Sequence, residues 1–221
     1  MLVGDWMREG VTTVTEDVSM TKAGRIMHQL NIRRLPVVDA EGVLSGIVTE
    51  RDIKAASPSK ATSLDMYEMS RLLSEIKVRD IMTAKPLRLR PGDTVERAAA
   101  IMRDNKVGGL PVVDDEDRVV GILTDTDIFR LFTTVSGVDL GGIQLAARLP
   151  MEKGKLKQLI DDLRGEEAQG ARIVSMFSHL DPVDETMRTV YIRILPVTEA
   201  EEYRLKDFIQ ARHQLLYWVK D

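Results

Sequence analysis

The sequence predicts an α+β protein that contains two copies of a β-α-β-β-α unit, followed by a different domain of βαββαβ order. The main observation is a repeat: residues 3–54 resemble the residues that lie 75 positions later. The segment RRLPVVDAEGVLSGIVTERDI (residues 33–53), for example, aligns with GGLPVVDDEDRVVGILTDTDI (residues 108–128). A unit copied once indicates two like domains packed about a pseudo-twofold axis, with clefts between their similar surfaces. The chain after about residue 135 no longer follows the repeat. The expected divisions are therefore 1–56, a connecting segment 57–76, 77–134 and 135–221.

Hydrophobic spacing defines the elements of the first copy. Residues 11–14 are expected to form a short strand, and residues 34–38 a buried one. The helix between them has apolar residues at i, i+3, i+4 and i+7, namely Ala23, Ile26, Met27 and Leu30. Residues 39–42 are typical of a turn, so residues 43–48 are expected to return as the second strand of a hairpin. A second helix is expected to begin at Thr49.

The second copy follows the same order, with strands at residues 110–113 and 119–123 and a helix from Thr124. The connecting segment breaks at Pro58, and its apolar residues then predict a helix that packs on the repeats: Leu64, Tyr67, Leu72 and Ile76. In the last domain we expect strands at 143–149, 171–177, 189–195 and 215–219. Two helices separate them, which gives the ferredoxin-like arrangement.

Composition excludes several classes of function. The chain of 221 residues has 43% hydrophobic and 30% charged residues and a net charge of -4, which gives no general reason to expect a nucleic-acid or membrane partner. It has no cysteine, and its three histidines are too scattered to form a metal site. A charged N-terminus and the lack of a long apolar run favour a cytoplasmic protein. No phosphate-binding loop or nucleophile elbow is present, so we expect neither a catalytic site nor a cofactor.

The strongest candidate motif is GIVTERD at residues 46–52, matched by GILTDTD at residues 121–127. In each, a strand ends at a threonine where a helix begins, and an aspartate follows three residues later. One interpretation is a capping box, in which Thr49 and Asp52 satisfy free backbone donors at the helix start. The other is a nucleotide site, because a helix N-terminus attracts phosphate and a carboxylate can accept both ribose hydroxyls. The motif alone leaves both open.

The whole repeat, with its V-x-D-h-M, h-P-V-V-D and G-h-h-T-x-x-D patterns present twice, resembles a tandem CBS-domain pair, or Bateman module, over residues 1–134. The resemblance implies clefts that bind adenine nucleotides or related adenosyl ligands, with the motif aspartate on the ribose. It implies a first site formed by Thr13, Val14, Arg33, Arg34, Pro36, Thr49, Arg51 and Asp52. It implies a second site formed by Arg88, Gly108, Gly109, Pro111, Thr124, Thr126 and Asp127.

The two implied sites differ in charge. Arg33, Arg34 and Arg51 correspond to Gly108, Gly109 and Thr126 in the second copy. Arginine suits bidentate phosphate binding, so the first site is expected to prefer phosphorylated ligands. The alternative is that the arginine pair at the start of the strand is simply solvated. Two further basic residues, Arg88 and Arg90, could restore some positive charge at the second site or point to solvent.

Together with the last domain, the connecting segment resembles the acetoin-utilisation protein B (AcuB-like) family, in which a CBS pair precedes an ACT-like domain. The resemblance places an ACT ligand loop at residues 149–156, with Pro150 and Gly154 as its candidate residues. This loop lacks the usual acidic residue, which favours a dimerisation domain over an amino-acid site. We also expect a homodimer, because residues 190–195 alternate as a strand paired between chains would.

These observations favour a non-enzymatic regulatory protein that senses adenine nucleotides and is linked to acetoin or energy metabolism. Two alternatives remain. One is a small enzyme of acetoin metabolism, and the other is an interaction scaffold whose clefts stay empty. The sequence names neither the adenosyl ligand nor the protein that is regulated.

Overall fold

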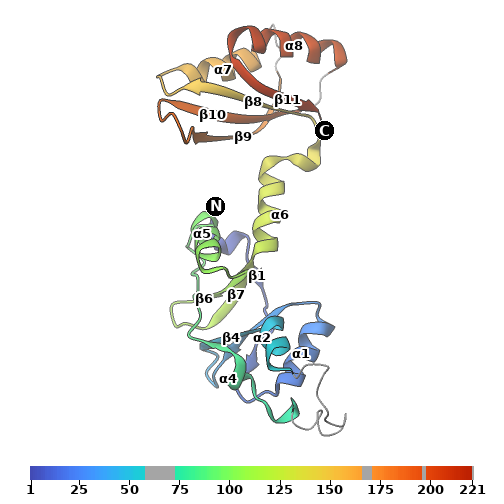
Figure 1. Ribbon diagram of the computed structural model, residues 1–221, viewed down its shortest axis with the longest axis vertical. Helices are drawn as coiled ribbons and strands as arrows, with labels where there is room; N and C mark the ends of the chain where they lie inside the picture. The colour runs from blue at the N-terminus through green and yellow to red at the C-terminus, as the bar shows by residue number, and fades with distance from the viewer. Residues whose placement is uncertain (58–72, 166–170, 196–197, 221) are drawn as a thin grey trace. The chain divides into compact units, whose positions relative to one another are not determined.

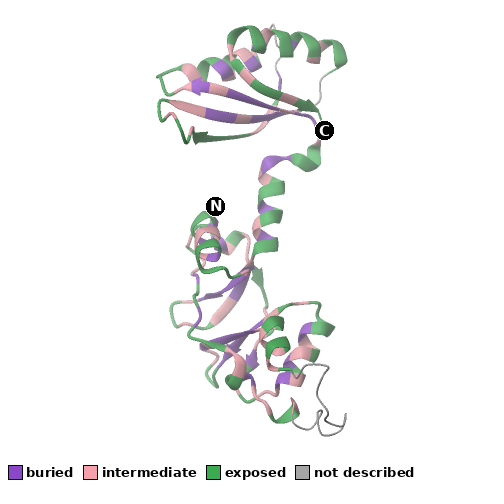
Figure 2. Cartoon of the chain, in the orientation of Figure 1, coloured by how far each residue is buried: buried purple, intermediate pink, exposed green. Residues whose placement is uncertain are grey.

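The structure, a computed structural model, describes residues 1–57, 73–165, 171–195 and 198–220. It divides into two compact units, Met1–Phe129 and Arg130–Asp221 (Figure 1). The division falls within helix α6 (Asp125–Ser136), as does the boundary after residue 134 that the sequence suggested. Buried residues follow the strands and the inward helix faces of both units (Figure 2), and each unit has its own hydrophobic core.

The first repeat contains β2 (Val14–Thr15), α1 (Met20–Gln29), β3 (Arg34–Val38), β4 (Leu44–Thr49) and α2 (Glu50–Ala56). Helix α1 begins where Ser19 Oγ accepts a hydrogen bond from the Lys22 amide at 3.3 Å. Its inward face packs on the hairpin and includes Ala23 and Met27, as the apolar spacing predicted. Strand β2 is shorter than expected: it begins at Val14, which pairs in parallel with Val37.

The second repeat contains α4 (Val78–Ile81), β5 (Thr83–Ala84), α5 (Val95–Asn105), β6 (Gly109–Val113), β7 (Val119–Thr124) and α6. The first repeat opens with the equivalents of α4 and β5, a 3-10 helix η1 (Val3–Asp5) and strand β1 (Arg8–Glu9). Thr94 Oγ1 caps α5 by accepting from the Arg97 amide at 3.2 Å. The connecting residues Leu64, Tyr67 and Leu72 lie outside the described part of the chain, whereas Ile76 O accepts a hydrogen bond from the Met20 amide.

Each repeat gives its first short strand to the sheet of the other. The strand orders are β2-β3-β4-β5 and β1-β7-β6, so β5 of the second repeat completes the first sheet and β1 completes the second. The registers match: Arg8 lies opposite Ile122, and Thr83 lies opposite Ile47, which are equivalent positions in the two copies. Neither two-residue strand was expected from the sequence. This exchange determines which side chains reach each threonine–aspartate motif.

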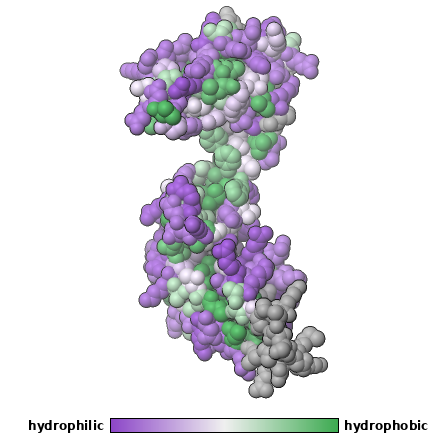
Figure 3. All heavy atoms as spheres, in the orientation of Figure 1, coloured by the Kyte–Doolittle hydropathy of each residue, from purple (hydrophilic) through white to green (hydrophobic). Residues whose placement is uncertain are grey.

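The two hairpins meet at equivalent positions. Val43 forms a β-bridge with Arg118, its counterpart 75 residues on, and the Leu44 amide donates to Asp117 O at 3.0 Å. A contact between a residue and its own equivalent places the pseudo-twofold axis of the pair at this point. The face of this unit seen in Figure 3 is mostly hydrophilic, with hydrophobic side chains set between the charged ones.

The C-terminal unit has the element order that the sequence predicted. After η2 (Val138–Leu140) come β8 (Ile143–Pro150), α7 (Lys155–Arg164), β9 (Ile173–Leu180), β10 (Met187–Ile194), α8 (Glu199–Arg212) and β11 (Gln214–Lys220). They form one antiparallel sheet in the order β11-β8-β10-β9. Both helices cover the same face (Figure 1), because Leu159 of α7 and Leu205 of α8 enter one core with Leu145 and Val190.

One expectation for this unit was wrong. The alternation of residues 190–195 predicts a strand available for pairing between chains, but β10 is an inner strand. It pairs with β8 on one side, Val190 opposite Ala147, and with β9 on the other, Val190 opposite Ser178. Its backbone donors and acceptors are therefore used within the chain. The sheet edges are β9 and β11 instead.

Candidate functional site

Both threonine–aspartate motifs form capping boxes. The Thr49 amide and hydroxyl each donate to Asp52 Oδ2 at 2.7 Å, and the Asp52 amide donates back to Thr49 Oγ1 at 3.4 Å. The second motif repeats this arrangement: the Thr124 amide and hydroxyl donate to Asp127 Oδ2 at 3.0 and 2.5 Å. These bonds satisfy donors at the start of each helix. They use one carboxylate oxygen of each aspartate, so a second role for the other oxygen is compatible with capping.

The remaining carboxylate oxygens have different surroundings. Asp127 Oδ1 accepts a hydrogen bond from Arg8 Nε at 3.0 Å, and Asp127 is only 1% exposed. Burial acts to raise the pKa of Asp127, but the hydrogen bonds from Thr124 and Arg8 outweigh it and leave that pKa lowered. Asp52 is partly exposed. Among the described residues, the hydrogen bonds to its side chain come from Thr49 and end on Oδ2.

Asp52 lines a cleft of about 1070 Å³ whose walls come from both repeats of the N-terminal unit. The first repeat contributes the end of β4 and the start of α2, with Arg33 and Arg34 from the start of β3. The second contributes the stretch around β5, the end of α5 and the start of β6. The size suits a small organic ligand.

Basic residues outnumber acidic ones on the walls of this cleft. The five basic residues are Arg33, Arg34, Arg51, Arg103 and Lys106, and the three acidic residues are Glu50, Asp52 and Asp125. Arg103 and Lys106 come from the end of α5. Such a surface favours an anionic ligand, and the arginines can bind phosphate through two nitrogens each.

Arg34 packs against the glycine pair of the other repeat. Its guanidinium lies where a Cβ on Gly109 would be, and its Nη2 is 2.9 Å from the Cβ position of Gly108. Burial lowers the pKa of Arg34, while the nearby Asp125 carboxylate raises it and Arg33 lowers it further. An arginine stays charged at neutral pH despite such a shift. The arginine and glycine pairs, which were expected in separate sites, thus lie together in one cleft.

Apolar side chains line another part of the cleft. Leu87 is 47% exposed, Val107 37% and Phe129 69%. Pro86 and Pro111 also line the cleft. An apolar surface next to cations and a carboxylate can hold a flat base while the polar groups bind sugar and phosphate. The sequence alone did not predict six lining residues, which the strand exchange, the packing of α5 and the start of α6 bring to the cleft: Thr83, Pro86, Leu87, Arg103, Lys106 and Phe129.

Several residues expected in the two sites do not line this cleft. Val14 and Pro36 are buried in β2 and β3. Thr13 precedes β2 and is also absent from the cleft walls, as is Thr126, whose amide donates to Asp125 Oδ1 at 2.7 Å. Thr124 and Asp127 form their own capping box and are not among the residues that line the cleft. Gly108, Gly109 and Pro111, expected at the second site, line the cleft together with Asp52.

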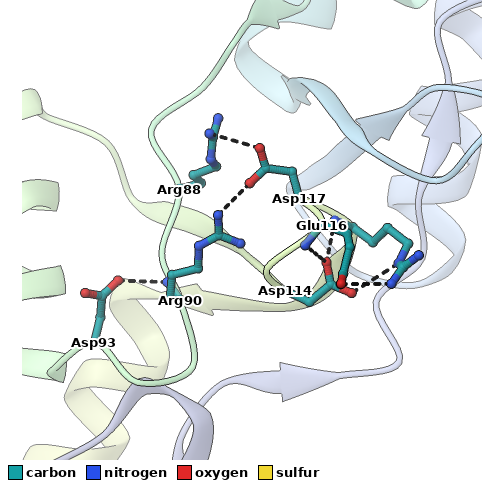
Figure 4. A network of polar contacts seen from close by, with 7 residues as sticks. Arg88, Arg90, Asp93, Asp114, Glu116 and Asp117 are labelled. Carbon is teal, nitrogen blue, oxygen red and sulfur yellow. Dashed lines mark hydrogen bonds and ion pairs between the residues drawn. The ribbon is translucent and has the colours of Figure 1, made fainter.

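Arg88 is held by the hairpin of the second repeat. Its Nη2 donates to Asp117 Oδ2 at 3.1 Å, and Arg90 Nη2 donates to Asp117 Oδ1 at 2.8 Å, so both arginines converge on one carboxylate (Figure 4). Asp117 itself has a positive φ of 62°. The Arg90 amide donates to Asp93 Oδ2 at 2.7 Å. The bonds of Arg88 and Arg90 to Asp117 connect the segment before α5 to the turn between β6 and β7.

The candidate loop of the C-terminal unit joins β8 to α7. Pro150 ends β8, and Gly154 precedes α7 with a φ of 90°. Glycine is favoured there because this backbone conformation is strained for other residues. Across residues 1–57, 73–165, 171–195 and 198–220, no group of three or more His, Asp or Glu could hold a metal ion. No helix in the same ranges is long and apolar enough to cross a membrane.

Comparisons with known proteins identify the repeats. The CBS domain family model matches residues 3–59 and 78–133, together just over half of the chain. A CBS domain-containing protein of Dictyostelium discoideum is 34% identical over 135 residues, covering 61% of this chain and 93% of that protein. A homoserine O-acetyltransferase of Methanohalobium evestigatum is 34% identical over 129 residues, but the chain spans only 24% of its length.

Solved structures give the same result. The CBS domain pair of protein MJ0100, in complex with 5'-methylthioadenosine and S-adenosyl-L-methionine, is 33% identical with a TM-score of 0.51, covering 61% of this chain and 97% of that one. CBSX2 in complex with AMP is 30% identical with a TM-score of 0.51 and the same coverage, 61% and 97%. A protein from Vibrio cholerae assigned as acetoin utilization protein AcuB is 30% identical with a TM-score of 0.52, covering 63% and 95%. The duplicated unit, its paired sheets and these matches agree, and the chain belongs to the CBS domain family.

Proposed function

We propose that this protein is a regulatory sensor that binds an adenine nucleotide, or a related adenosyl ligand, in the cleft between its CBS repeats. The cleft itself carries the proposal: it combines the partly exposed carboxylate of Asp52, five basic residues and an apolar wall. Two similar CBS pairs bind adenosyl ligands, 5'-methylthioadenosine with S-adenosyl-L-methionine in one and AMP in the other. Each similarity covers 61% of this chain.

Each part of the ligand has a partner in the cleft. The Oδ1 atom of Asp52 would accept from the two ribose hydroxyls while Oδ2 keeps its capping bonds. Arg33 and Arg51 are exposed on the cleft wall and would bind the phosphates. The base would lie against Leu87 and Phe129. These are the roles that the family resemblance implied for Asp52, Arg33 and Arg51, with the apolar wall added.

We also propose that the C-terminal unit is an ACT-like domain that mediates homodimer formation and responds to nucleotide binding, in a cytoplasmic protein of the AcuB-like kind. Its βαββαβ order and its 4-stranded antiparallel sheet support this assignment. Light scattering at micromolar concentration tests the dimer. A monomer there contradicts it, and a dimer that persists without residues 135–221 places the interface in the CBS pair.

Calorimetric titration with adenosine, AMP, ADP, ATP and S-adenosyl-L-methionine tests the nucleotide proposal, with GTP as the control for the base. Saturable binding of an adenosine compound supports it. Heat changes no larger than those of buffer for all of them favour the scaffold alternative. The alternative of an acetoin-metabolising enzyme predicts turnover in a substrate screen that survives loss of residues 1–134. Enzyme activities of longer relatives do not transfer, because the chain spans about a quarter of their length.

A further inference from the structure

Arg8 and Thr83 occupy the same position in the two repeats, but they differ in what they do to the neighbouring motif. The strand exchange places Arg8 opposite Ile122 in β7, two residues before Thr124. The equivalent register places Thr83 opposite Ile47, two residues before Thr49. Each motif therefore receives one side chain from the first strand of the other repeat. It is an arginine at the second motif and a threonine at the first.

At the second motif, the arginine side chain forms a hydrogen bond with the carboxylate of Asp127. Arg8 Nε donates to Asp127 Oδ1 at 3.0 Å, while Thr124 donates twice to Oδ2, so protein donors reach both oxygens. Asp127 is 1% exposed, whereas the Arg8 side chain bonded to it is 53% exposed. A guanidinium–carboxylate bond is stronger than a bond from a neutral hydroxyl, so ribose hydroxyls do not displace it easily.

The first motif has the opposite arrangement. Thr83 is exposed and lines the cleft beside Asp52. Within the described ranges, the hydrogen bonds to this carboxylate come from Thr49 rather than from Thr83. Among the described residues, no cation forms an ion pair with Asp52. The two repeats therefore carry the same threonine–aspartate motif, but Asp52 of the first lines the cleft, whereas Asp127 of the second is buried and bonded to Arg8.

We propose that Arg8 closes the second nucleotide motif, so that one chain binds one adenine nucleotide, on Asp52, and that the residue at position 8 decides this stoichiometry. The proposal rests on the nucleotide-binding function proposed above. The expectation drawn from the arginine and glycine pairs concerns the charge of the two sites. This proposal instead concerns Arg8, and it predicts that one substitution outside the cleft, Arg8→Thr, creates a second nucleotide site.

The test is calorimetric titration with AMP of the full-length wild type, Arg8→Thr, Asp52→Ala and the double variant Arg8→Thr/Asp52→Ala. We expect one site in the wild type and two in Arg8→Thr. In Asp52→Ala the single site should weaken about tenfold or more, and the double variant should show one site of unchanged affinity beside this weakened one. Arg8→Met, which removes the donor but keeps an unbranched side chain, should also bind two. The reciprocal change Thr83→Arg should abolish binding by the wild-type cleft, and Arg25→Thr, an exposed arginine outside the cleft, should leave one.

Circular dichroism and urea unfolding establish that each variant is folded. Two molecules of AMP on the wild type overturn the proposal, as does a single molecule on both folded Arg8 variants. A single wild-type site whose affinity is unchanged in Asp52→Ala but lost in Asp127→Asn overturns it while leaving the nucleotide function intact. Failure of the wild type and of both Arg8 variants to bind adenosine, AMP or ATP overturns both proposals.

Discussion

Arg34 lies against Gly109, the residue that occupies its own position in the other repeat. Equivalent residues approach one another near a pseudo-twofold axis, and two arginines cannot share that space. The difference between RRLPVV and GGLPVV therefore has a packing cause as well as an electrostatic one: one repeat supplies the guanidinium and the other supplies the room for it.

Gly109→Ala should disturb this contact. A Cβ there would meet the Arg34 guanidinium and lie 3.1 Å from Leu123 O, so we expect a loss of about 1–3 kcal/mol in the free energy of unfolding, typical of overpacking. Urea denaturation measures it. Gly92→Ala is the control, because a Cβ on Gly92 meets nothing within 4 Å. Equal stability of the two variants would contradict the packing argument.

Asp52→Ala should weaken nucleotide binding. Loss of a hydrogen bond to a charged acceptor costs about 1.5–3 kcal/mol, which is roughly tenfold or more in Kd. The same change removes the cap of α2, so the unfolding free energy should fall by about 1 kcal/mol. Asp80→Ala is a matched control, since Asp80 Oδ2 accepts from the Lys77 amide at the start of α4 and lies outside the cleft. If both variants bind AMP as the wild type does, Asp52 is a cap alone.

Arg33→Ala/Arg51→Ala should separate phosphate binding from adenosine binding. We expect the affinity for ATP to fall about tenfold or more, while that for adenosine changes little, because each arginine contributes a charge-assisted bond to phosphate. The ATP affinity of the wild type should also weaken as salt is added. Arg25→Ala/Arg97→Ala removes two exposed arginines elsewhere and should bind ATP normally. An unchanged preference for ATP in the cleft variant would shift the phosphate role to Arg34, Arg103 or Lys106.

Lys106→Gly should stabilise the fold and weaken ATP binding at the same time. Lys106 ends α5 with a φ of 55°, a conformation that costs a side-chain-bearing residue about 1 kcal/mol relative to glycine. Lys85 has a φ of 49° and lies outside the cleft, so Lys85→Gly should gain similar stability with no change in binding. Urea unfolding and ATP titration of both variants distinguish the backbone effect from the charge effect. Equal ATP affinity in the two variants would remove Lys106 from the phosphate site.

The lowered pKa of Asp127 implies that the free energy of unfolding depends on pH. Its pKa is lowered in the folded protein, so its stabilising contribution is fully present above the unfolded value of about 3.9 and is lost as pH falls through the lower folded value. Arg8→Thr removes one of the bonds that lower this pKa. The wild type should therefore be more stable than Arg8→Thr at pH 7, and the difference should shrink at about pH 3. A difference that stays constant between these two pH values would contradict this role of Arg8.

Spacing patterns in the sequence were enough to predict the longer elements and the capping boxes. Helix α1 follows the apolar positions from Ala23 to Met27, and Thr49 caps α2 with Asp52 as the motif suggested. These features depend on local periodicity and on neighbours three or four residues apart. The repeat was likewise enough to predict that two similar domains pair, because each copy carries the same pattern of buried strands.

The shared cleft could not be predicted in the same way. Strands β1 and β5 are two residues long, too short to show a period, and their exchange depends on pairing partners more than 35 residues away. Without that exchange, Arg8 has no visible relation to Asp127, nor Thr83 to the cleft around Asp52. The arginine and glycine pairs were visible as a difference between copies, but only the packing across the axis shows that they lie together.

A crystal structure of the full chain grown with saturating ATP tests nucleotide binding in the cleft most directly. We predict one ATP per chain, with the ribose hydroxyls within hydrogen-bond distance of Asp52 Oδ1, the phosphates on Arg33 and Arg51, and Arg8 still bonded to Asp127. A nucleotide bound only at Asp127, or a cleft without nucleotide in protein that binds no ATP by calorimetry, would contradict the proposed site.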